Sequence, residues 1–154
     1  MLPHKHFVYG ILLSLILVLI MPQIGFIGVF LIISSTVCLD ADHYIYYLYK
    51  KKDWSLVNAY RFFRNTHKKF LAMPIEKRVR YYGAWCFLHG IEVLILVFLL
   101  TLFVSEYFGF VFIGIAFHLL LDYFEHWNFY SRFDKISLAY DFLKFRKLKN
   151  INEI

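Results

Sequence analysis

Acidic and histidine side chains follow an apolar segment near the start of the chain, where they could bind a metal ion. The segment STVCLDADHYIYYLY places Asp40, Asp42 and His43 directly after hydrophobic residues. An ionised carboxylate near the centre of a bilayer costs about 2.5 to 3.5 kcal/mol, and a bound cation would offset that cost. Carboxylates and imidazoles together are typical ligands of zinc, manganese and iron. We therefore expect a divalent metal, with zinc first and manganese or iron as alternatives.

Later apolar segments carry the same residue types at helical spacing. His118 and Asp122 are four residues apart, and His89 and Glu92 are three apart, so each pair shares a helix face. His6 stands just before the first apolar segment. The complete set of predicted metal ligands is Asp40, Asp42, His43, His89, Glu92, His118, Asp122 and His6. This set exceeds the four ligands of one zinc ion, so the sequence allows two ions.

Hydrolysis is the chemistry that this ligand set predicts. A metal ion would lower the pKa of water and polarise a phosphoryl or acyl group. A carboxylate that does not bind the metal could act as general base, and the candidates are Glu92 and Asp42. On an ideal helix Asp42 would point roughly 160 to 200° away from Asp40, so the two can share a site only if the helix loosens there. The sequence leaves that question open.

The composition identifies the elements that must position these residues. Of the 154 residues, 60% are hydrophobic and 21% are aromatic, well above the average for soluble proteins. Apolar segments at about 7–21, 24–39, 84–104 and 108–127 are candidate spans, although a spanning helix needs roughly 20 residues. We predict one all-α, polytopic membrane domain over 1–154, with four transmembrane helices, a loop at 50–82 and a tail at 128–154.

The basic residues predict the orientation of these spans. All 17 Lys and Arg residues lie at position 5, in the loop 50–82 or in the tail 128–154. The positive-inside rule makes these parts cytoplasmic, with both termini inside a multi-pass protein of the inner or plasma membrane. The candidate ligands then lie at the cytoplasmic ends of the spans. The sequence does not predict an oligomeric state.

The loop and the tail are also expected to form amphipathic helices on the membrane surface. In the loop, Asn58, Arg61 and Asn65 fall at helical spacing, and Pro74 should end that helix. Such a surface would attract anionic lipid head groups, and a lipid phosphate or other ester is the predicted substrate. Nucleic-acid binding is the weaker interpretation, because membrane topology already requires this positive charge.

Two cysteines lie within apolar segments. The sequence surrounding Cys38 and Cys86 does not resemble a secreted disulfide framework. Buried cysteines commonly act as small apolar side chains. We therefore interpret both as packing residues.

Three short motifs resemble those of one known family. LDADH at 39–43 looks like the Pro-Asp-x-Asp-His signature of the membrane-bound metal-dependent hydrolases, which include the LexA-binding inner-membrane hydrolase. HFVYG at 6–10 is similar to that family's N-terminal histidine with a glycine four residues later, and GIAFHLLLD at 114–122 is similar to its late His-x3-Asp. The chain departs from the family before the third span, where FLHGIEVL brings His89 and Glu92. The resemblance implies a divergent member with hydrolase activity.

Other functions use similar residues. Carboxylates and histidines from four helices also resemble a di-iron oxidoreductase, although the Glu-x-x-His pairs of that class are absent from the sequence. A metal or proton transporter, or a scaffold with a structural metal, is the non-enzymatic alternative. Protonated acids that hydrogen-bond between helices would explain the same residues without any metal.

Overall fold

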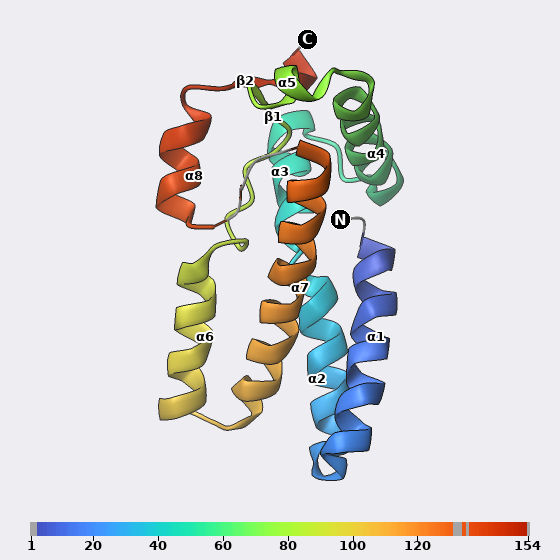
Figure 1. Ribbon diagram of the computed structural model, residues 1–154, viewed down its shortest axis with the longest axis vertical. Helices are drawn as coiled ribbons and strands as arrows, with labels where there is room; N and C mark the ends of the chain where they lie inside the picture. The colour runs from blue at the N-terminus through green and yellow to red at the C-terminus, as the bar shows by residue number, and fades with distance from the viewer. Residues whose placement is uncertain (1–2, 131–133, 135, 154) are drawn as a thin grey trace. The chain divides into compact units, whose positions relative to one another are not determined.

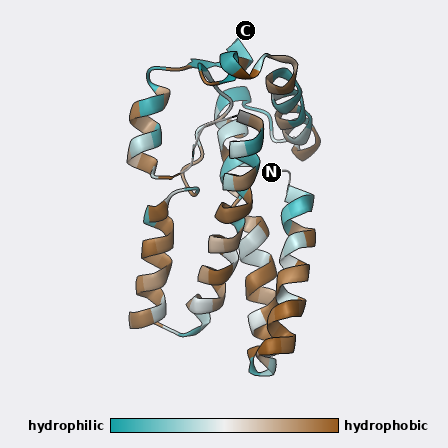
Figure 2. Cartoon of the chain, viewed as in Figure 1, coloured by the Kyte–Doolittle hydropathy of each residue, from teal (hydrophilic) through white to brown (hydrophobic). Residues whose placement is uncertain are grey.

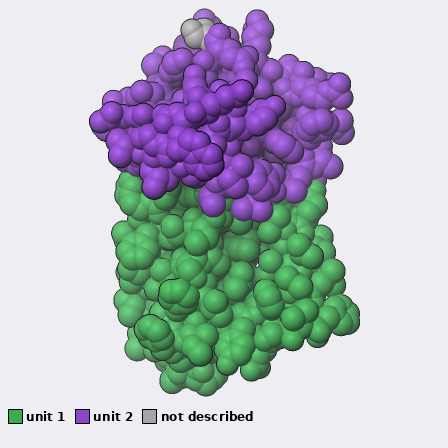
Figure 3. All heavy atoms as spheres, turned by 180° about the vertical axis from the view of Figure 1, so that it is seen from behind, with its two compact units in different colours: residues 1–40, 90–122 green, residues 41–89, 123–154 purple. Residues whose placement is uncertain are grey.

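The computed structural model describes residues 3–130, 134 and 136–153 of the chain (Figure 1). Most of the described residues are helical and only one pair of two-residue strands occurs among them, so the predicted all-α class is confirmed. The chain divides into two compact units, which Figure 3 shows in different colours. Unit 1 comprises Met1–Asp40 and Gly90–Asp122, and unit 2 comprises Ala41–His89 and Tyr123–Ile154.

Unit 1 is built from apolar helices. Its elements are α1 (Pro3–Ile20), the 3-10 turn η1 (Pro22–Ile24), α2 (Gly25–Cys38), α6 (Ile91–Phe103) and the first part of α7 (Tyr107–Tyr130). A tight turn joins α1 to α2, because Pro22 begins η1 and Gly25 adopts a left-handed φ of 63°. The two helices pack against each other as a hairpin (Figure 1).

Three helical segments of the described chain are long and apolar enough to cross a membrane. They are Pro3–Ile20, Pro22–Lys51 and Tyr107–Phe129. Large apolar side chains such as Phe26 and Leu19 are more than four-fifths exposed, as expected for a lipid-facing surface. Figure 2 shows the same hydrophobic character along α1, α2 and α6. These features fit a membrane protein.

The prediction of four such helices was wrong, because the third predicted span yields only a short helix. Helix α6 covers 13 residues, about 20 Å at 1.5 Å per residue, against a hydrocarbon core of about 30 Å. The residues from 84 to 90 are not helical. In unit 2 the backbone N–H of Leu88 donates to the Asp42 carboxylate (2.9 Å), which holds this segment in a turn. A helix can begin only after Gly90.

Small residues allow the helices of unit 1 to pack closely. A Cβ added at Gly10 would lie 3.3 Å from the Thr36 side chain. One added at Gly114 would lie 2.0 Å from Ser35 Oγ and 2.6 Å from the backbone oxygen of Ile32. The Thr36 hydroxyl lies within hydrogen-bonding distance of the backbone oxygens of Ile32 (2.6 Å) and Gly114 (3.4 Å). Small side chains of this kind are typical of helix contacts in membranes.

Unit 2 consists of shorter and more polar elements. They are α3 (Ala41–Lys51), α4 (Leu56–Ala72), α5 (Ile75–Arg78), β1 (Tyr81–Tyr82), the end of α7, α8 (Leu138–Phe145), β2 (Lys149–Asn150) and η2 (Ile151–Glu153). Ser55 caps α4 by accepting from the Asn58 backbone N–H. The helix ends at Ala72, two residues before Pro74, as the sequence predicts.

The end of the chain is fastened into unit 2 by polar contacts. Strands β1 and β2 pair in parallel. The Asn152 side chain joins the Thr66 hydroxyl (2.7 Å) to the Gly83 backbone oxygen (3.1 Å), and Asn150 donates to the Tyr46 hydroxyl (2.8 Å). Because these bonds link segments far apart in sequence, the C-terminal residues help to hold α3 and α4 in place.

Candidate metal centres

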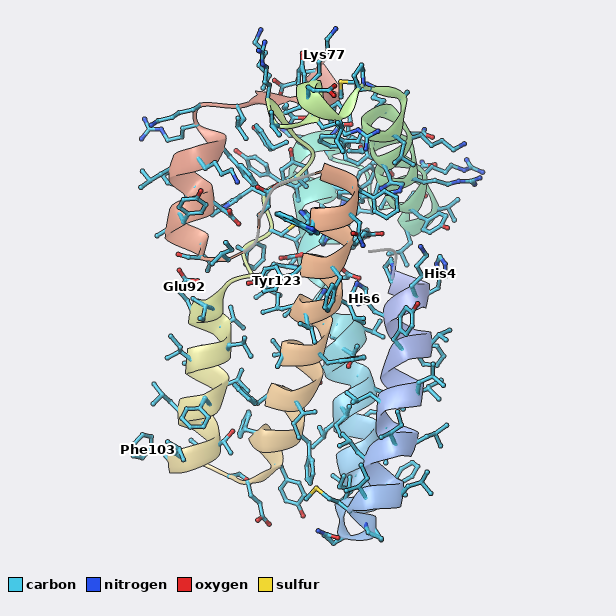
Figure 4. The ribbon with its side chains drawn as sticks, in the orientation of Figure 1. His4, His6, Lys77, Glu92, Phe103 and Tyr123 are labelled. Carbon is cyan, nitrogen blue, oxygen red and sulfur yellow. The ribbon has the colours of Figure 1, made fainter. Side chains whose placement is uncertain are left out.

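Four ligand-type side chains of unit 1 converge at one buried point. They are His6 on α1, Asp40 after the end of α2, and His118 and Asp122 on α7. Figure 4 shows His6 near the start of α1. Three of these residues have no exposed surface, and Asp40 keeps 8%. We call this group the unit 1 centre.

The hydrogen bond made by His118 determines which ring nitrogen is available. Nδ1 of His118 lies 2.7 Å from the backbone oxygen of Thr36, which can only accept, so Nδ1 carries the proton. When the ring is neutral, Nε2 presents a lone pair. That lone pair lies 3.7 Å from Oδ2 of Asp122 and 3.8 Å from Oδ1 of Asp40. Metal-binding histidines are oriented by the same kind of bond from their second nitrogen.

His6 is a fully buried polar group of the unit 1 centre. Neither of its ring nitrogens has a hydrogen-bond partner among the described residues. Nε2 lies 3.3 Å from Oδ1 of Asp122 and 3.9 Å from Oδ2 of Asp40, and the ring stacks on that of His118 with centroids 3.7 Å apart. A buried group of this kind costs free energy unless a further partner is bound.

The spacing of these donors fits a metal ion. Two ligands of a tetrahedral zinc ion lie about 3.3 to 3.4 Å apart when the bonds are about 2.0 to 2.1 Å long. The nitrogen–oxygen distances in the unit 1 centre run from 3.3 to 3.9 Å. His6, His118 and Asp122 each offer one donor atom within 4.8 Å of the others. Two imidazoles and a carboxylate are a donor set for zinc, iron or manganese.

The packing of unit 1 explains how these ligands meet. Two of the ligands stand one helical turn from a glycine at a close helix contact: His6 from Gly10 on α1, and His118 from Gly114 on α7. Residues four apart lie on one face of a helix. The side of each helix that packs tightly therefore also carries the ligand.

A second cluster lies in unit 2 and consists of Asp42, His43, Cys86 and His89. Asp42 accepts three hydrogen bonds: Oδ1 from Nδ1 of His43 (2.9 Å), and Oδ2 from Nδ1 of His89 (2.8 Å) and the Leu88 backbone N–H (2.9 Å). Sγ of Cys86 lies 3.4 Å from Nε2 of His43. We call this group the unit 2 cluster.

The predicted site residues occur in both units. Asp40 contacts ligands of unit 1, whereas Asp42 contacts ligands of unit 2, because α2 ends at Cys38 and α3 begins at Ala41. Glu92 lies in the first turn of α6 (Figure 4) and belongs to none of the groups of donors found among the described residues. His89 lies in the turn before α6, so it does not share a helix face with Glu92.

Cys86 is the candidate ligand that the sequence interpretation missed. Its surroundings are apolar in sequence, and its neighbours His43 and Asp42 are far away along the chain. The spacing Cys86-x-x-His89 was a signal, because two metal ligands often stand three residues apart.

Unit 2 also has an open cleft of about 400 Å³ at the start of α4. The polar stripe of Asn58, Arg61 and Asn65 lines it, together with Lys51 and the Phe62 ring. The Asp53 carboxylate also lines the cleft and accepts from the Asn58 amide (2.9 Å), so the lining carries charges of both signs.

The comparisons do not place the chain in a family. No family model, curated protein or solved structure matches it.

Proposed function

We propose that this protein is a membrane-embedded, metal-dependent hydrolase whose metal ion is held by the unit 1 centre. The observation that carries the proposal is the convergence of two imidazoles and two carboxylates in a buried site where His6 has no hydrogen bond from a described residue. Two ionised carboxylates beside neutral histidines would leave two negative charges buried. A divalent cation neutralises that charge.

The residues divide into ligands and a candidate base. His6, His118 and Asp122 form the compact donor group, and three protein ligands are the number that a catalytic zinc site keeps. Asp40 lies slightly farther away, at 3.8 and 3.9 Å from the two histidines, and is the most exposed of the four. Asp40 is therefore better placed to accept a proton from an attacking water than Glu92 or Asp42, the bases predicted from the sequence.

When bound, a divalent metal would polarise an ester and lower the pKa of water. His118 would keep its ring fixed through Thr36, and the close helix packing would keep the ligands aligned. The apolar helices of unit 1 support a substrate that enters from lipid. A lipid phosphate or other ester is the class we propose, because the basic surface would attract anionic head groups.

The topology with both termini in the cytoplasm requires α6 to cross the membrane. Its 13 residues are shorter than a usual span, but a short helix can be accommodated where the bilayer thins around it. The absence of Lys and Arg between residues 6 and 49 and between 81 and 131 supports this arrangement.

Metal analysis combined with an ester screen tests the proposal. Purified protein should contain a transition metal, and Asp122→Asn should lose it. Asp40→Asn should retain the metal but lose release of phosphate or alcohol from lipid esters. Glu106→Gln, in the turn between α6 and α7, is the matched control and should change neither. A metal-free wild type whose stability is the same with and without chelator would contradict the proposal.

An oxidoreductase is the second candidate, because two histidines and one carboxylate are also the ligand set of non-haem iron enzymes. Iron in the purified protein, together with oxygen consumption and no ester cleavage, would favour this function over hydrolysis.

A further inference from the structure

The unit 2 cluster contains a cysteine that the proposed hydrolase reaction does not use. Cys86 is buried at 6% exposure, and its sulfur lies 3.4 Å from Nε2 and 3.7 Å from Nδ1 of His43. The His43 ring contacts the His89 ring edge to face, with centroids 4.9 Å apart. A cysteine with an imidazole on one side and a second imidazole nearby is unlike a cysteine that only fills apolar space.

Asp42 determines the state of both histidines. Its two oxygens accept from Nδ1 of His43 and Nδ1 of His89, and the Leu88 backbone N–H gives a third bond. Both rings therefore carry a proton on Nδ1, and each neutral ring presents a lone pair on Nε2. A carboxylate behind a histidine is the usual support of a metal ligand, because it orients the ring and makes it more basic.

We propose that His43, Cys86 and His89 bind a second metal ion of the soft or borderline class, with Asp42 as the residue that positions the two rings. This proposal does not rest on the proposed hydrolase function. A tetrahedral ion with a metal–sulfur bond of about 2.3 Å and a metal–nitrogen bond of about 2.05 Å separates the two donors by about 3.6 Å. The 3.4 Å between Sγ and Nε2 is close to that value.

Two further features favour an ion over a simple thiol–imidazole hydrogen bond. One donor atom from each of the four residues lies within 4.8 Å of the others. The His43 side chain keeps 21% exposure, whereas Asp42 and His89 have none, so the cluster is buried except at His43. Thiolate with imidazole selects zinc or copper(I) over magnesium or calcium.

Cobalt(II) substitution provides a direct test in the full chain. Metal-free protein in detergent should develop a thiolate-to-cobalt charge-transfer absorption as cobalt is added. Cys86→Ser should abolish this absorption, and Cys38→Ser, which changes the other cysteine, should leave it intact. Asp42→Asn should keep the absorption but weaken cobalt binding about 10- to 100-fold, as expected for a residue behind the ligands.

A variant of the unit 1 centre distinguishes this proposal from the hydrolase proposal. Asp122→Asn should reduce total cobalt but leave the thiolate absorption unchanged. Absence of the absorption from the wild type, or its survival in Cys86→Ser, would overturn the second site. If Cys86→Ser fails to fold, alkylation of the wild-type cysteines tests the second site instead. Zinc should protect Cys86 from alkylation but not Cys38. Equal labelling of Cys86 with and without zinc would overturn the proposal.

Discussion

Substitution of Gly114 by alanine tests whether close packing of α7 against α2 positions the unit 1 centre. The added Cβ would lie 2.6 Å from the backbone oxygen of Ile32 and 2.0 Å from Oγ of Ser35. The serine can rotate, but the backbone oxygen cannot. To restore an ordinary contact of about 3.4 Å, α7 must move away from α2 by about 0.8 Å, which exceeds the tolerance of about 0.2 Å in metal–ligand distances.

The sign of the stability change makes this test informative. Alanine favours a helix over glycine by about 0.5 to 1 kcal/mol, so Gly114→Ala would be stabilising if the contact were loose. Overpacking costs about 1 to 3 kcal/mol, so we expect a net destabilisation on the order of 1 kcal/mol. If the added methyl group strains the arrangement that binds metal by about 1.4 kcal/mol more than the metal-free arrangement, metal affinity should fall about tenfold.

Thermal unfolding and zinc titration of the detergent-solubilised protein measure both effects. Gly109→Ala is the matched control on the same helix, because its Cβ would meet only Thr101, at 3.4 Å. Ser35→Ala combined with Gly114→Ala should restore part of the loss, since the contact with the Ile32 oxygen remains. If Gly114→Ala behaves like Gly109→Ala in both measurements, packing at this contact does not position the ligands.

Three further outcomes are expected. In a cysteine-free background, a cysteine at Lys51 should be labelled only from the cytoplasm and one at Glu106 only from outside; the reverse pattern would refute the orientation. The Tyr47 hydroxyl and neighbouring donors hold the pKa of Asp53 below its ordinary value. The wild type should therefore be more stable than Asp53→Asn above about pH 4, and this difference in unfolding free energy should disappear as the pH falls further. A difference that does not change with pH would contradict this. Asn152→Ala should destabilise unit 2 by about 1 to 3 kcal/mol in denaturant unfolding, because two part-buried hydrogen bonds are lost, each worth about 0.5 to 1.5 kcal/mol; an unchanged midpoint would show that these bonds are not needed.

Local signals in the sequence were sufficient for much of the fold. Pro22 and Pro74 mark the ends of helices, and Ser55 stands at a helix start, so short-range rules locate these boundaries. The four-residue spacing of His118 and Asp122 correctly placed both on one helix. The position of His6 before an apolar segment was enough to include it among the candidate ligands.

The features that could not be predicted depend on contacts between distant segments. The turn that delays α6 is held by the bond from Leu88 to Asp42, and no local pattern indicates that bond. Asp40 and Asp42 have different neighbours because α2 ends at Cys38 and α3 begins at Ala41. The sequences on both sides of this break favour helix, so the sequence does not reveal the break. The neighbours of Cys86 depend equally on the tertiary structure.

The order in which the ligands occur along the chain has a consequence for biosynthesis. His6 is made first, and its partners His118 and Asp122 follow only after most of the chain has been synthesised. Until α7 has been made, His6 and Asp40 have each other but lack His118 and Asp122, so the α1–α2 hairpin is complete before the whole centre can form. Assembly of the unit 1 centre must therefore be a late step that follows synthesis of α7. If the centre binds metal as proposed, a limited metal supply would affect the final packing of α7 rather than formation of the first hairpin.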